Sequence, residues 1–197
     1  MEDDFIMKKL LLGLILILFV LACSQFIPSP TPNTADVEKE EQAIYSFFVG
    51  ANEGTVLILQ ETSTSISPLD SKDIRDNIMS GFKNISRETV KSYLERNAEP
   101  SQLSLDMDLG AEYTLLTPEE LSKITSQPNW HEILNEKYPG SGGYTIFSRV
   151  GFNNTLDQAV VYVGQVEGPL MGTGFYNLLE KQDGVWKLMD QIMVWIS

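Results

Sequence analysis

The spacing of hydrophobic and polar positions changes near residue 144 of this 197-residue chain. Before that point, apolar residues recur every three or four positions, which is the spacing of amphipathic helices. After it, they alternate with polar residues or form short continuous runs, which is typical of strands. We therefore expect an α+β fold in which N-terminal helices pack on a C-terminal four-strand antiparallel meander.

The helical part begins with a predicted helix over Glu38–Asn52. Ile44, Phe47, Phe48 and Ala51 follow one another at the intervals that place them on a single helix face. Capping signals predict the later helices. Their start positions are Asp70 or Ser71, Ser86, and Thr117 before Pro118, and another helix carries Trp130, Ile133, Leu134 and Tyr138 and stops at Pro139-Gly140.

Strands are expected mainly in the last third of the chain. A short apolar strand is predicted at Thr55–Gln60, and alternation of leucine and polar residues predicts a half-buried one at Leu103–Leu109. The four meander strands are Tyr144–Asn153, Gln158–Val166, Gly174–Lys181 and Val185–Ile196. Asp183-Gly184 marks the last hairpin, and the short connections make neighbouring strands antiparallel.

The N-terminus has the three parts of a secretory signal. Lys8-Lys9 precede Leu10–Ala22, thirteen residues without a polar side chain. At about 1.5 Å per residue such a helix spans about 20 Å, less than the roughly 30 Å of a bilayer core. We expect a signal peptide at residues 1–22 and a flexible, proline-rich linker up to residue 36. A single globular domain follows at residues 37–197.

The segment Val20-Leu21-Ala22-Cys23 resembles a bacterial lipobox. The resemblance implies that Cys23 carries a thioether-linked diacylglycerol, and in many bacteria an amide-linked acyl chain as well. Two or three acyl chains anchor a protein durably, whereas a single chain does so only reversibly. The expected location is therefore the extracytoplasmic side of the cell membrane or the outer membrane, with the membrane as a partner through Cys23.

Composition narrows the classes of partner that the globular domain could bind. The formal net charge is −13, from 14 basic and 27 acidic residues, so the basic surface needed for nucleic acid is missing. Cys23 is the only cysteine, so the chain forms no intramolecular disulfide. The expected partner is an envelope protein or a small molecule, and no cofactor is predicted.

Arg149 is the most prominent candidate for binding chemistry. In a regular strand it shares a face with Phe147 and Gly151, and a buried guanidinium needs a paired carboxylate. Asp190 is the expected partner, because it lies amid an apolar face of the last strand. The alternative is an anion-binding role for Arg149. Gly151 is expected to permit a bend or the close packing of Tyr162 or Trp186.

Other candidates have a structural explanation. His131 is the only histidine and lies off the apolar stripe of its helix, so a solvent position is expected. Asp106 and Asp108 resemble the start of a calcium loop, but the loop's glycine and glutamate are missing. Pro139–Gly143 leads from a helix into a strand, the reverse of a phosphate-binding loop. We assign no catalytic residue and no metal site.

Two wider resemblances concern the order of the elements and the sequence of most of the last sixty residues. Helices followed by a curved meander with a tryptophan in the hairpin resemble the cone-shaped fold of ketosteroid isomerases and nuclear transport factors. The segments YPGSGG, FSRVGFN, QAVVYVG, LLEKQDGVWK and VWIS are similar to a group of small bacterial secreted proteins and lipoproteins of uncharacterised activity. We expect a lipid-anchored, non-enzymatic binding or interaction domain, acting through a concave sheet face or an apolar loop such as residues 168–171. The alternative is a small-pocket enzyme of the isomerase kind, acting on an acidic or apolar small molecule.

Overall fold

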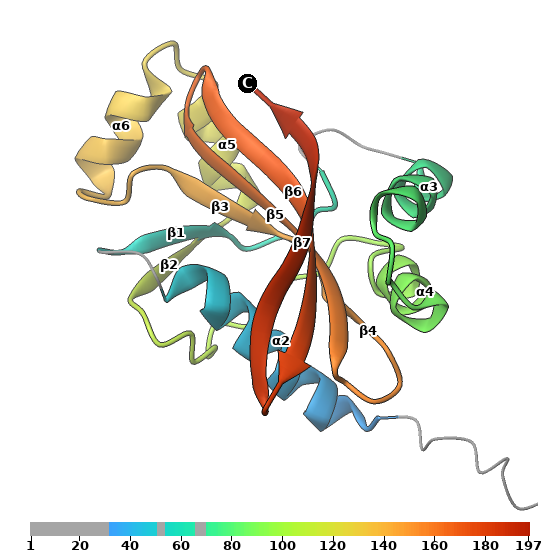
Figure 1. Cartoon of the computed structure of the whole chain (residues 1–197). Helices are drawn as coiled ribbons and strands as arrows, with labels where there is room; N and C mark the ends of the chain where they lie inside the picture. Colours follow the sequence, from blue (N-terminus) through green and yellow to red (C-terminus); the bar gives the residue numbers. More distant parts are fainter. Residues whose placement is uncertain (1–31, 51–53, 66–69) are drawn as a thin grey trace, which may run out of the picture. The chain divides into compact units, whose positions relative to one another are not determined.

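The structure is a computed structural model that describes residues 32–50, 54–65 and 70–197. The predicted signal peptide, Cys23 and most of the predicted linker lie outside the described residues. Residues 32–197 form one compact unit of the α+β class, as predicted (Figure 1).

The described residues form five helices and one seven-stranded sheet. The helices are α2 (Thr34–Val49), α3 (Ser71–Gly81), α4 (Arg87–Arg96), α5 (Pro118–Thr125) and α6 (Trp130–Lys137). The strands are β1 (Val56–Leu59), β2 (Tyr113–Leu116), β3 (Tyr144–Phe147), β4 (Gly151–Phe152), β5 (Gln158–Gly168), β6 (Met171–Gln182) and β7 (Val185–Ile196).

Side-chain caps start three helices where the sequence predicts them. Asp70, Ser86 and Thr117 each accept a hydrogen bond from a backbone N–H in the first turn of α3, α4 and α5. The first helix starts earlier than predicted, because Asn33 caps it by accepting from the backbone N–H of Asp36. Thr34–Asp36, assigned to the linker from the sequence, therefore belong to α2.

The strand order is β2-β1-β3-β5-β6-β7, and β4 also pairs with β5. β1 runs parallel to both β2 and β3, and all other pairs are antiparallel. The sheet therefore extends beyond the four predicted strands, with β1 and β2 added at one end. β2 was not predicted.

The predicted strand over residues 103–109 is wrong. It forms no strand, and an isolated bridge between Glu61 and Gln102 is the only pairing beside it. The Tyr113 hydroxyl accepts from the Met107 N–H at 3.0 Å and approaches the Leu105 carbonyl at 3.1 Å, which holds the segment in a turn. Leu103, Met107 and Leu109 are buried, whereas Leu105 is 70% exposed, so the turn buries three of the four apolar residues that a strand would have buried.

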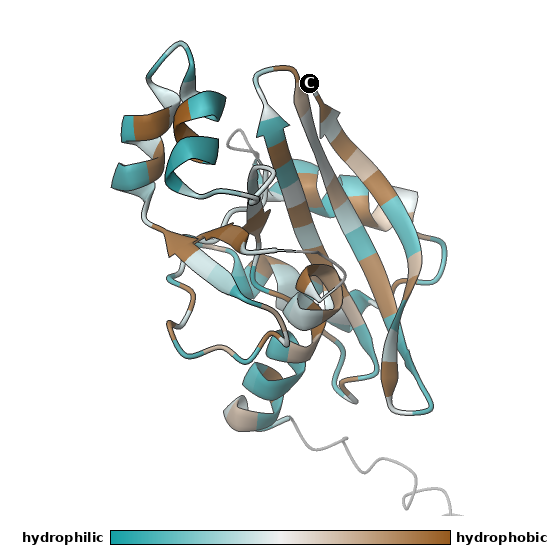
Figure 2. Ribbon diagram, turned by 90° about the vertical axis from the view of Figure 1, so that its left-hand side faces the viewer, coloured by the Kyte–Doolittle hydropathy of each residue, from teal (hydrophilic) through white to brown (hydrophobic). Residues whose placement is uncertain are grey.

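Buried apolar clusters cover both faces of the sheet. On one face, α2 and residues 103–111 pack against the sheet. On the other, α3 and α4 pack against β3, β5 and β6, and α5 and α6 pack against β1 and β2. Figure 2 shows hydrophobic positions interleaved with hydrophilic ones along the long strands, as expected where alternate side chains enter opposite layers.

Candidate functional site

Arg149 lies in a bulge between β3 and β4. Phe147 pairs with Val163 of β5, and Gly151 pairs with Val160 of β5. The chain therefore advances four residues from 147 to 151 while β5 advances only three. The extra residue reverses the alternation of side chains, as bulges do. Phe147 and Val150 consequently enter the same buried cluster, which a regular strand over Tyr144–Asn153 does not allow.

The carboxylate that pairs with Arg149 belongs to Glu41 of α2. The Arg149 Nε atom lies 2.9 and 3.1 Å from the two Glu41 oxygens, and Nη2 lies 2.8 Å from Oε2. The expected partner, Asp190, is exposed on β7, where it accepts from the N–H of its neighbour Gln191. An ion pair inside the domain therefore exists, but it joins the bulge to α2 and not to β7.

The Glu41 carboxylate also accepts hydrogen bonds from three further groups. It accepts from Arg96 Nη2 at 2.9 Å, from the Val150 N–H at 2.8 Å and from the Tyr45 hydroxyl at 3.1 Å. Burial by itself raises the pKa of Glu41, but the hydrogen bonds and charges of Arg149 and Arg96 outweigh it and lower that pKa overall. The carboxylate is only 6% exposed and stays ionised.

Side chains also satisfy the backbone of the bulge. Asn97 at the end of α4 accepts from the Arg149 N–H and donates to the Arg149 carbonyl, each at 2.9 Å. The Tyr45 hydroxyl also lies 2.9 Å from the Ser148 carbonyl, so its one hydrogen is shared between this carbonyl and the Glu41 carboxylate. Because buried backbone groups without partners are costly, these contacts explain how an interrupted strand is tolerated in the core.

A hollow of about 280 Å³ borders the ion pair. Arg149 lines it together with Glu38, Glu41, Gln42 and Tyr45. An anion that entered the hollow would meet two carboxylates, and Glu41 already takes the Nε and Nη2 donors of Arg149. The geometry favours the structural role of Arg149 over the anion-binding one.

Sequence reasoning missed both Glu41 and Asn97. Glu41 precedes Ile44, Tyr45 and Phe48 by three, four and seven positions, so it lies on the buried stripe of its own helix. A carboxylate on such a stripe signals a buried basic partner. Asn97 gives no comparable signal, because an asparagine at the end of a helix is common.

Gly151 allows α4 to approach the sheet. A Cβ atom at this position would lie 2.4 Å from the Cβ and 2.5 Å from the Cα of Tyr93. The neighbour that uses this space is therefore Tyr93, and not Tyr162 or Trp186 as expected from the sequence.

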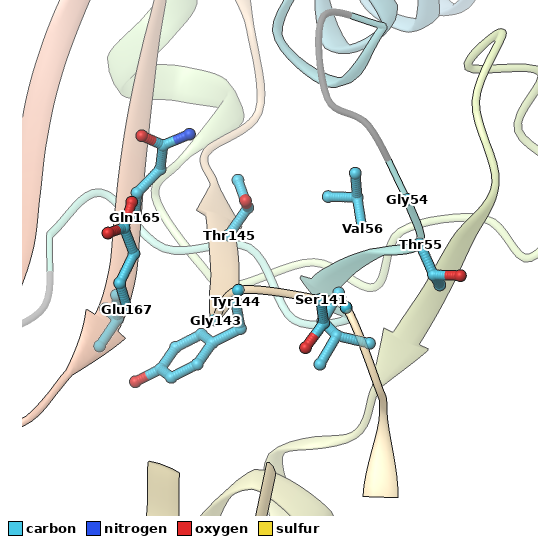
Figure 3. Close-up of a pocket in the computed structure, with 13 residues that line it drawn as sticks. Gly54, Thr55, Val56, Ser141, Gly143, Tyr144, Thr145, Gln165 and Glu167 are labelled. Carbon is cyan, nitrogen blue, oxygen red and sulfur yellow. The ribbon is translucent and has the colours of Figure 1, made fainter. Parts of the chain in front are cut away.

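A second hollow, of about 340 Å³, lies where the turn at residues 140–143 passes the beginnings of β1 and β3 (Figure 3). Its wall carries hydroxyl and amide groups from Thr55, Thr145 and Gln165, and one carboxylate, from Glu167. Figure 3 shows the side chains of Tyr144 and Thr145 leaving β3 in opposite directions. The wall has no basic side chain in the described residues, which disfavours phosphate and other anions.

The exposed large apolar side chains gather at one edge of the sheet. Ten described residues of this kind are more than a third exposed, and seven of them lie on β7, on the turn between β5 and β6, or at the first residue of β6. We call these seven the β7 surface: Leu170, Met171, Val185, Leu188, Met189, Met193 and Ile196. It includes the apolar loop at residues 168–171 that the sequence indicated, since Leu170 is 82% exposed.

The other sequence candidates bring no chemistry together. His131 is half-buried rather than fully in solvent, and Asp106 and Asp108 are exposed in the turn that replaces the predicted strand. Within the described ranges, no group of three His, Cys, Asp or Glu residues is arranged to hold a metal ion. None of the described helices combines the length and apolar character needed to cross a membrane.

Searches against protein families, curated proteins and solved structures found no match to this chain.

Proposed function

We propose that this protein is a lipid-anchored, non-enzymatic interaction domain of the cell envelope. In this proposal Cys23 holds the lipid, and β7 binds an extended segment of a partner protein as an additional strand. The single observation that carries the binding role is the concentration of exposed apolar side chains on the β7 surface.

The free edge of β7 has the features of a strand that accepts a partner. β7 is twelve residues long and ends the strand order, so its outer backbone groups have no neighbouring strand in the described part of the chain. Proteins normally protect such an edge with lysine, proline, short length or β-bulges, and of these β7 has one lysine and two register shifts against β6. Here Lys187 and Asp190 are the only charged residues along β7, and it contains no proline. Backbone hydrogen bonds would supply affinity and the apolar side chains would supply specificity.

The alternative, an isomerase-like enzyme on a cone-shaped four-strand meander, gains no support from the described residues. Such an enzyme needs an acid whose pKa is raised in an apolar pocket. Every described carboxyl group with a resolved shift instead has a lowered pKa: Glu41, Glu120 and Asp157. Both sheet faces are also filled by buried clusters.

Photo-crosslinking tests the binding surface. A photoreactive amino acid is placed at Met193, which is 52% exposed on β7, and at the exposed Glu136 of α6 as the matched control. In cells that produce the full chain, we expect a discrete adduct from position 193 alone. The adduct should disappear when Met189→Lys places a charge on the same edge. Equal labelling from both positions, or an adduct that survives Met189→Lys, would refute the β7 surface as the binding site.

The anchor needs a separate test. Cells fed an alkyne analogue of palmitate should label the wild-type chain, and Cys23→Ser should remove the label and release the protein from the membrane fraction. Continued labelling of Cys23→Ser would refute the lipoprotein proposal while leaving the β7 surface open to its own test.

A further inference from the structure

A groove runs between α3 and α4 on the outside of the domain. It encloses about 540 Å³, within the range of about 300–1,000 Å³ typical of small-molecule pockets. Val90, Leu94 and Met79 supply its apolar floor and wall. Met79 is 41% exposed although it belongs to a helix whose Ile74 and Ile78 are buried. We call this the α3–α4 groove.

The rim of the groove is basic. Arg75, Arg87 and Lys91 border it, against one carboxylate, Glu95. Arg75 pairs with Asp76 at 3.2 Å and Lys91 approaches Glu95 at 3.7 Å, both on the exposed surface where such pairs contribute little. Arg87 has no carboxylate partner among the described residues.

This local charge contrasts with the chain as a whole. The helix pair at residues 71–97 carries six basic residues, of which Arg96 is paired with Glu41, and four acidic ones, whereas the net charge of the protein is −13. The basic residues are Lys72, Arg75, Lys83, Arg87, Lys91 and Arg96, and the acidic ones are Asp73, Asp76, Glu88 and Glu95.

The position of Arg87 is also unfavourable for the fold itself. It is the first residue of α4, where the helix dipole is positive and a cation is repelled. An unpaired guanidinium at this place, beside an apolar groove, is suited to a carboxylate or phosphate from outside the domain.

We propose that the α3–α4 groove binds a single-chain anionic amphiphile, a long-chain fatty acid. Its acyl chain lies on Met79, Val90 and Leu94, and its carboxylate accepts hydrogen bonds from Arg87. A concave groove suits one acyl chain better than a bilayer, and the acidic domain as a whole is repelled by anionic headgroups. The site is independent of the β7 surface and of the proposed anchor.

Displacement of a fluorescent fatty acid tests this site. The Cys23→Ser protein is used in detergent-free buffer, so that no acyl chain on Cys23 competes. We expect palmitate to displace the probe below its micelle-forming concentration. Hexadecanol, which has the same chain and no charge, should bind at least about tenfold more weakly, since a charged hydrogen bond contributes about 1.5–3 kcal/mol.

Matched variants locate the site. Arg87→Gln should weaken palmitate binding about tenfold and leave hexadecanol binding unchanged, whereas Lys72→Gln, on the same helix pair but outside the groove, should change neither. Met79→Asp should weaken both ligands. Met189→Asp is its control, because Met189 is similarly exposed, at 47%, but lies on β7.

Three outcomes would overturn the proposal. The first is no displacement by monomeric palmitate. The second is an equal effect of Arg87→Gln and Lys72→Gln, which would make the charge effect nonspecific. The third is that the protein sediments with anionic vesicles but does not bind monomeric palmitate. If Arg87→Gln also abolished this sedimentation, the groove would be assigned to a membrane surface instead. Because Arg87 and Met79 are exposed, circular dichroism is expected to show wild-type folding for each variant.

Discussion

Replacing Glu41 by glutamine tests whether the Arg149 bulge is held from inside the domain. The substitution keeps the size of the side chain but removes a charge that two guanidinium groups and the Val150 N–H share. Breaking a buried ion pair costs about 3–5 kcal/mol. Here the side chains of Arg149 and Arg96 are 25% and 23% exposed and can regain some water, so we expect a loss of about 2–4 kcal/mol.

Urea unfolding followed by tryptophan fluorescence measures this loss. Asp190→Asn is the matched control, because it removes one carboxylate that is exposed and makes no ion pair among the described residues. It should change the free energy of unfolding by about 0.5 kcal/mol or less. Equal effects of Glu41→Gln and Asp190→Asn would refute the assignment of Glu41 as the partner of Arg149.

The pH dependence of the free energy of unfolding gives an independent check on the role of Glu41. The pKa of Glu41 is lowered in the folded state from its usual 4.5, so the unfolded chain takes up a proton first as the pH falls. The stabilisation is therefore complete above the unfolded pKa and is lost as the pH falls through the folded pKa. The difference in unfolding free energy between wild type and Glu41→Gln should be constant near neutral pH and should shrink only below pH 4.5. A difference that shrinks between neutrality and that pH would contradict this reasoning.

Three further predictions test the surrounding packing. Gly151→Ala should lower stability by about 1–3 kcal/mol in thermal unfolding, because the new methyl group overlaps Tyr93, whereas Gly168→Ala, whose Cβ would have ordinary contacts, should be nearly neutral. Gln158→Leu should lower urea stability by about 1–3 kcal/mol, because its side-chain oxygen accepts from a backbone N–H and a hydroxyl that then lose their acceptor. Burial raises the pKa of Tyr162 to about 12, so its phenolate absorbance should rise near that pH. The contribution of the protonated Tyr162 hydroxyl to the free energy of unfolding should be complete below pH 10 and should fall above it.

The parts of the fold that the sequence predicts well are those that local chemistry decides. Asp70, Ser86 and Thr117 start helices by capping their own first turns, and those interactions are visible within a few residues. β2 was missed because it has only four residues and pairs in parallel with β1, more than fifty positions earlier. Parallel strands are not joined by a tight turn, so no local turn sequence predicts their pairing.

The candidate site also combines a feature that the local sequence predicts with one that depends on long-range packing. The chemistry of Arg149 correctly required an internal carboxylate, but choosing Asp190 assumed that an apolar sequence around a residue means burial. β7 is the edge strand, so several of its apolar residues, among them Leu188 and Met189, stay exposed, and so does Asp190. The actual partner, Glu41, lies 108 positions away on α2, and only the packing of that helix on the bulge brings the two together. Periodicity identifies a buried face but not the element that covers it.

Six basic residues of the described domain illustrate two different roles. Arg96, Arg149 and Lys181 form ion pairs of 2.7–2.9 Å with Glu41 or Glu40, so their charges connect α2 to the rest of the domain. Arg75 and Lys91 have only exposed, longer contacts, and Arg87 has none among the described residues. At the rim of the α3–α4 groove Arg75, Arg87 and Lys91 face one carboxylate, Glu95, so the fold leaves positive charge there that it does not use. Net charge alone conceals such a site, because the −13 of the whole chain averages over this basic rim and the acidic remainder.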